Sequence, residues 1–74
     1  MTDDERMKMV IDRTAAQLSL ACVANGDRAA MIDAGAIIAA ARNYLIMRHG
    51  RRATYTLFAG LADEIIKPEL PVGP

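Results

Sequence analysis

The sequence is poor in the residues that build disulfide frameworks, metal centres and aromatic cores. It contains one cysteine, one histidine, no tryptophan and only three aromatic residues among 74. A single Cys22 excludes an internal disulfide and fits a reducing compartment such as the cytoplasm. No CxxC, HExxH or glycine-rich phosphate loop occurs, and too few nucleophiles and bases are present for a catalytic constellation. We therefore predict no enzymatic activity, no cofactor and no metal.

The sequence also lacks a net charge. Nine basic residues balance nine acidic ones, whereas a protein that binds DNA on its own usually has a positive excess that neutralises phosphates. The first residues, MTDDERMK, are acidic and polar, so we expect no signal peptide. The longest apolar run, AGAIIAAA (34–41), is far shorter than the roughly 20 residues that span a bilayer. These features predict a cytoplasmic protein that binds no membrane and is a poor candidate for nucleic acid.

What the chain does have is apolar residues, which make up 53% of it. They are mostly alanine, isoleucine, leucine and methionine, and no alternating strand-like pattern of Val, Ile and Thr occurs. This composition favours helices. The apolar fraction is high for a small domain with little interior to fill, so part of it is expected to meet a partner chain or another copy.

Capping and breaking residues divide the chain into three expected helices. Thr2 and Glu5 have the spacing of a capping box, and a helix over 3–24 would end at Asn25-Gly26. Asp33 is the expected N-cap of a second helix over 33–49, while 27–32 fits either a linker or an earlier helix start. Gly50 separates this helix from a third, 51–66, which ends before Pro68. The sequence thus predicts an all-α three-helix bundle over 1–67 and a disordered, proline-rich tail over 68–74.

The first expected helix carries apolar side chains on two opposite sides. At 100° per residue one stripe should face the core; it comprises Met7, Val10, Ile11, Thr14, Leu18, Ala21 and Cys22. The opposite stripe comprises Met9, Ala16, Leu20 and Val23. One core cannot bury both. The second stripe either packs on the tail or on 27–32, or it forms a surface for a partner, which the five methionines of the chain favour.

A cationic cluster surrounds Gly50 in the segment RHGRRATYTLF (48–58). Arg48 and His49 suit the negative end of the second helix dipole, but Arg51 and Arg52 oppose the positive end of the third. The cluster is either a solvated junction paired with acidic residues of the first helix, or a positive rim for an acidic partner surface. Tyr55 beside it is the residue type that anchors such contacts.

The helix–glycine–helix arrangement also raises the possibility of a helix-turn-helix. In that motif a small residue precedes the turn glycine by four positions and a buried aliphatic residue follows it by six. Ile46 and Thr56 occupy these positions, and Arg51 stands directly after the glycine, where an apolar residue is common. The start of the third helix nevertheless offers arginines and hydroxyl groups where bases would be contacted. A small DNA-binding repressor or excisionase-like factor is therefore the alternative function.

The run AAARNYLIMRHGRRATYTLFAGLADEII (39–66) resembles the C-terminal part of short helical proteins of alphaproteobacteria. The size, helical content and near-neutral charge of the chain are similar to those of the small quorum-sensing antiactivators of rhizobia. This resemblance implies binding and occlusion of a transcriptional activator, in quorum sensing or mobile-element transfer, and assigns no individual residue. A structural subunit of a phage or conjugation assembly is a further alternative. The expected partner-binding residues are Met9, Leu20, Val23, Arg48, Arg51, Arg52 and Tyr55.

Overall fold

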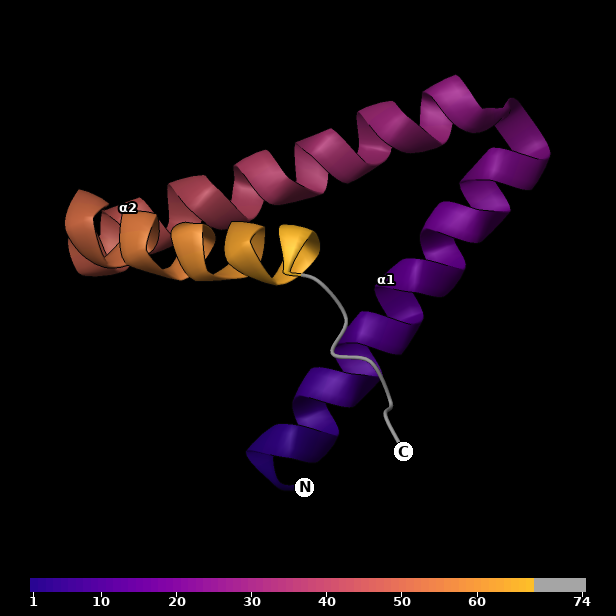
Figure 1. Ribbon diagram of the computed structural model, residues 1–74. Coiled ribbons are helices and arrows are strands. Elements are labelled where there is room, and N and C mark those ends of the chain that lie inside the picture. Colours follow the sequence, from indigo (N-terminus) through magenta and orange to yellow (C-terminus); the bar gives the residue numbers. More distant parts are fainter. Residues whose placement is uncertain (68–74) are drawn as a thin grey trace, which may run out of the picture. The chain divides into compact units, whose positions relative to one another are not determined.

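The computed structural model describes residues 1–67, and all of its regular structure is helical (Figure 1). Helix α1 comprises Asp3–Asn25, and helix α2 comprises Asp27–Ile66. No strand occurs in this part of the chain. The predicted all-α class is confirmed, but the structure has two helices where three were expected. The predicted disorder of the tail concerns residues 68–74, which lie outside the described range.

The start of α1 is fixed by the predicted capping box. The Glu5 backbone N–H donates to the Thr2 hydroxyl at 3.2 Å, and the Thr2 backbone N–H donates to a Glu5 carboxylate oxygen at 3.2 Å. Two of the N–H groups that a helix start leaves without intrahelical partners are thereby satisfied. These hydrogen bonds lower the pKa of the Glu5 carboxyl below its usual value of 4.5.

Gly26 is the only residue between the two helices. Its N–H donates to the Cys22 carbonyl at 2.8 Å, and its own carbonyl accepts from the Ala30 N–H at 3.2 Å. The ambiguous segment 27–32 is therefore the first part of α2, and Asp33 as the N-cap of this helix was wrong. The physical reason is that Gly26 already accepts the first helical hydrogen bond, while Asp27 suits the positive end of the dipole.

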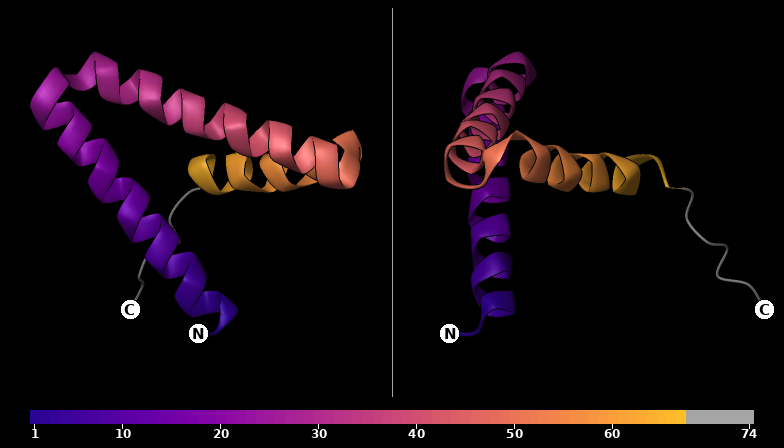
Figure 2. Two further views of the ribbon diagram at one scale, coloured as in Figure 1. Left: turned by 180° about the vertical axis from the view of Figure 1, so that it is seen from behind. Right: turned by 90° about the vertical axis from the view of Figure 1, so that its left-hand side faces the viewer.

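The predicted break at Gly50 exists, but as a single non-helical residue inside α2. Gly50 has φ 87° and ψ 170°, and helical structure resumes directly after it. The Thr54 hydroxyl donates to the Gly50 carbonyl at 2.9 Å, so a side chain of the following helical segment is hydrogen-bonded back to the residue of the break. The abrupt change of direction is visible in both views of Figure 2. We call residues 40–66 the elbow.

Burial in the described residues is much lower than a bundle core would require. No apolar side chain is buried, and Thr54 is the one buried residue, at 5% exposure. In the predicted core stripe of α1, Thr14, Leu18 and Ala21 are half-buried. The other members are exposed, which contradicts their predicted burial; these are Met7, Val10, Ile11 and Cys22. A helix buries only the positions that another element covers, so the stripe alone did not determine burial.

The chain divides into two compact units, Met1–Ala39 and Ala40–Pro74. In the first unit the half-buried residues include Leu18 and Ala21 before Gly26 and Ala29 and Ala30 after it. In the second unit they are Leu45 and Ile46 before Gly50 and Phe58 and Ala59 after it. Side-chain packing is therefore concentrated within a few turns of each glycine.

Helix α2 is apolar over an unexpected length. Although its longest uninterrupted apolar run is short, it contains an 18-residue window of mean hydropathy 1.3, none of it buried. By length and composition alone such a helix could cross a membrane, but core helices of soluble proteins and signal sequences have the same composition.

Replacing Gly50 by alanine tests whether its backbone conformation sets the turn. A Cβ at Gly50 would contact nothing within 4 Å, so any loss of stability comes from the backbone conformation, which is nearly exclusive to glycine. We expect Gly50→Ala to lower the free energy of unfolding by about 1–3 kcal/mol. Gly60→Ala is the matched control, because Gly60 is helical with equal space around it, and should stabilise by about 0.5–1 kcal/mol. Equal melting temperatures of the two variants by circular dichroism would contradict this account.

The capping box predicts a pH dependence of α1. Because folding lowers the pKa of Glu5, its ionised form stabilises the helix above the unfolded pKa, and this contribution disappears as pH falls below about 4.5. Thr2→Ala should destabilise α1 by about 1 kcal/mol. Glu5→Gln retains the capping pattern but cannot titrate, so its helicity should fall less than that of the parent on acidification. The measurement is mean-residue ellipticity at 222 nm between pH 7 and pH 2.

Candidate functional site

The three predicted partner-binding residues of α1 are exposed. Met9 is 40% exposed, Leu20 70% and Val23 87%. Packing of the stripe on the tail or on segment 27–32 was one of its two explanations. Exposures of this size exclude packing of Leu20 and Val23 on 27–32, and the tail lies outside the described residues. The stripe is an apolar surface without a cover among the described residues.

The four predicted residues near Gly50 have different local surroundings. The Arg48 guanidinium lies over the ring of Tyr44, 5.9 Å from its centroid. The two residues are one helical turn apart, and their cation–π contact orients the Arg48 side chain. Tyr55 is 75% exposed and Arg51 and Arg52 are exposed. Tyr44 was not among the predicted residues, although its spacing of four from Arg48 is the signal that identifies such a pair.

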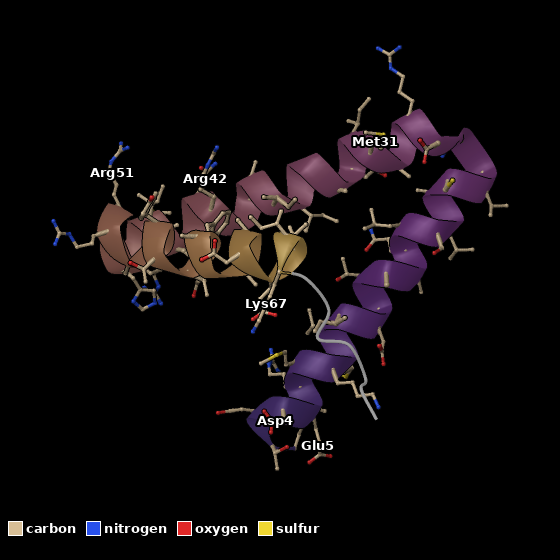
Figure 3. All side chains as sticks on the ribbon, viewed as in Figure 1. Asp4, Glu5, Met31, Arg42, Arg51 and Lys67 are labelled. Carbon is tan, nitrogen blue, oxygen red and sulfur yellow. The ribbon has the colours of Figure 1, made fainter. Side chains whose placement is uncertain are left out.

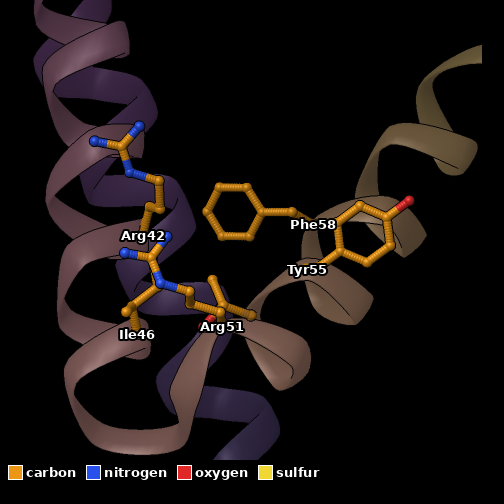
Figure 4. A pocket seen from close by; sticks show the side chains of 6 residues that line it. Arg42, Ile46, Arg51, Tyr55 and Phe58 are labelled. Atoms are coloured by element: carbon orange, nitrogen blue, oxygen red, sulfur yellow. The ribbon is translucent and has the colours of Figure 1, made fainter.

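The elbow contains an open groove with a volume of about 270 Å³ (Figure 4). We call it the elbow groove; its lining residues are Arg42, Ile46, Arg51, Thr54, Tyr55 and Phe58. Arg42 and Ile46 precede Gly50 and the other four follow it. The structure thus brings the predicted Arg51 and Tyr55 to one groove, whereas Arg48 and Arg52 are not part of its lining.

Four groove residues were missed as site residues by the sequence analysis: Arg42, Ile46, Thr54 and Phe58. Their positions follow from the turn, because residues at equal distances before and after Gly50 lie opposite one another near the elbow. Arg42 and Phe58 are each eight positions from Gly50, and Ile46 and Thr54 are each four. Figure 4 shows the Phe58 ring directed toward the Arg42 side of the groove, while the Tyr55 ring turns away from it.

The electrostatic character of the groove comes from two arginines. Arg42 and Arg51 project to the same side of α2 (Figure 3), and among residues 1–67 no acidic residue lines the groove. Ile46 and Phe58, both half-buried, supply apolar surface beside these guanidinium groups. Such an arrangement can bind a carboxylate next to an apolar side chain, because guanidinium groups form charge-assisted hydrogen bonds with carboxylates.

The hydroxyl groups at the start of the post-Gly50 helix are engaged by the backbone. Thr54 donates to the Gly50 carbonyl, and Thr56 donates to the Arg52 carbonyl at 3.0 Å. A hydroxyl that donates to its own helix is less available for reading a base edge. Within residues 1–67 no group of three or more His, Cys, Asp or Glu residues is placed to hold a metal ion.

Comparison with known proteins finds no match among family models, curated proteins or solved structures.

Proposed function

We propose that this chain is a small non-enzymatic regulatory protein of the cytoplasm that binds another protein. Its target in this proposal is a transcriptional activator, which it sequesters as an antiactivator in quorum sensing or mobile-element transfer control. The observation that carries the proposal is the extent of uncovered apolar surface. Eighteen large apolar side chains are exposed in the described residues, and none is buried.

A soluble chain with so much uncovered apolar surface is most stable when another polypeptide covers it. The stripe of Met9, Leu20 and Val23 offers an apolar contact along α1. Arg51, Arg52 and Tyr55 offer cations and an aromatic ring of the kind that anchors interfaces. Binding through both features would occlude the working surface of an activator without any chemical step, so the proposal requires neither cofactor nor metal.

DNA binding is the second candidate, because a helix–glycine–helix element with arginines after the glycine is present in the elbow. The zero net charge and the engaged hydroxyls of Thr54 and Thr56 favour the protein-binding proposal over it.

Charge substitutions in the α1 stripe test the protein interface. Leu20→Glu and Val23→Glu should leave the helicity of the free chain within a few per cent, since both side chains are exposed. They should weaken binding to a partner captured from the native cell by at least about tenfold, because the carboxylate would be buried without a counterion. Ala15→Glu, a charge at an exposed position on a different side of α1, is the matched control and should bind within about twofold of the parent. Unchanged binding of both stripe variants would place the interface elsewhere.

A titration with duplex DNA separates the two candidate functions. We expect no rise in fluorescence anisotropy with a labelled random duplex at about 150 mM salt and micromolar protein, conditions in which non-specific binders associate at roughly 10⁻⁴–10⁻⁶ M. A rise that steepens as salt is lowered and that disappears in Arg51→Ala would favour the repressor or excisionase-like function instead.

A further inference from the structure

The elbow groove selects its occupant by charge. Two guanidinium groups, those of Arg42 and Arg51, flank the apolar side chains of Ile46 and Phe58, and no acidic residue of the described part of the chain joins them in the lining. An occupant must therefore bring carboxylates beside apolar side chains. The groove of another copy does not fit, because its own arginines would face these two and like charges repel.

The N-terminal part of α1 has the required chemistry. Asp3 and Asp4 stand in its first turn, and Met7, Val10 and Ile11 follow on the same side at 100° per residue. A shallow depression on this face is lined by Asp3, Arg6, Met7, Val10 and Ile11. With Arg6 at its border, the face keeps a charge of −1 from two aspartates and one arginine. All three apolar side chains are exposed, so no other part of residues 1–67 covers this face.

We propose that two copies form a symmetric dimer in which α1 of each copy docks into the elbow groove of the other. Asp3 and Asp4 of one copy face Arg42 and Arg51 of the other, and Met7, Val10 and Ile11 cover Ile46 and Phe58. The two contacts are identical, as an isologous interface requires. The stripe of Met9, Leu20 and Val23 lies on the opposite side of α1 and stays available to a partner, as does Arg52, which is outside the groove lining. Arg51 is engaged in the dimer contact. The dimer itself does not rest on the proposed antiactivator function.

Charge reversal on the two surfaces tests the dimer with the full chain. Sedimentation velocity at micromolar concentration should give the mass of two chains for the parent. Arg42→Glu/Arg51→Glu and, separately, Asp3→Lys/Asp4→Lys should each weaken dimerisation about 100-fold, because both contacts then oppose like charges. Arg13→Glu/Arg28→Glu and Asp12→Lys/Asp63→Lys reverse equal charges away from both surfaces and should dimerise within about threefold of the parent.

Mixing the two monomeric double variants is the decisive measurement. In a mixed dimer, one contact joins the native aspartates of the first variant to the native arginines of the second. The other contact joins the introduced lysines of the second variant to the introduced glutamates of the first. Opposite charges therefore meet in both contacts. An equimolar mixture should therefore regain the mass of two chains. A mixture that stays monomeric while the parent is dimeric would overturn the exchange of α1. A monomeric parent would also overturn it, and a parent dimer unaffected by either reversal would place the dimer contact elsewhere.

Circular dichroism of each variant checks that the helices form. A variant that has lost helicity is replaced by the milder Arg42→Gln/Arg51→Gln or Asp3→Asn/Asp4→Asn.

Discussion

A helix can bury only those side chains that another element covers, and this constraint determines most of the properties of the chain. Among residues 1–67 the large apolar side chains that are half-buried lie near Gly26 or Gly50. The other large apolar side chains of this part of the chain are exposed to solvent. Because hydrophobic burial is the main favourable contribution to folding, the described residues supply little of this contribution within a single chain.

The positions of the charged side chains say more about which surfaces the chain can bind than its net charge does. Asp3, Asp4 and Glu5 occupy the first turn of α1, whereas Arg48, Arg51 and Arg52 cluster around Gly50. The net charge of zero therefore conceals an acidic first turn of α1 and a cluster of arginines around Gly50. Such segregation orients approaching molecules and rejects like-charged surfaces even when the total charge gives no long-range attraction. Composition alone weighs against nucleic acid, but it does not reveal this polarity.

Local signals in the sequence were sufficient for the start of α1 and for both turns, while burial depended on which elements cover which side chains. The capping box of Thr2 and Glu5 and the breaks at Gly26 and Gly50 were all predicted, because each depends on residues within a few positions. The helix start at Asp33 was wrong because a helical start at Asp27 satisfies the backbone equally well. The stripe of Met7, Val10 and Ile11 was assigned to a core because periodicity marks an apolar side without showing what covers it. Arg42 was missed because its role depends on the turn eight residues later.

Both turns use the same backbone geometry, with φ 94° and ψ 166° at Gly26 and φ 87° and ψ 170° at Gly50. These angles are the mirror image of an ordinary extended conformation, so an L-residue avoids them and a D-residue favours them. A D-alanine introduced at either position by chemical synthesis would adopt the native geometry and lose less backbone freedom on folding than glycine does. The positive-φ backbone conformation at Gly26 and Gly50, and not the small size of glycine, therefore sets the direction in which each helical segment leaves the one before it.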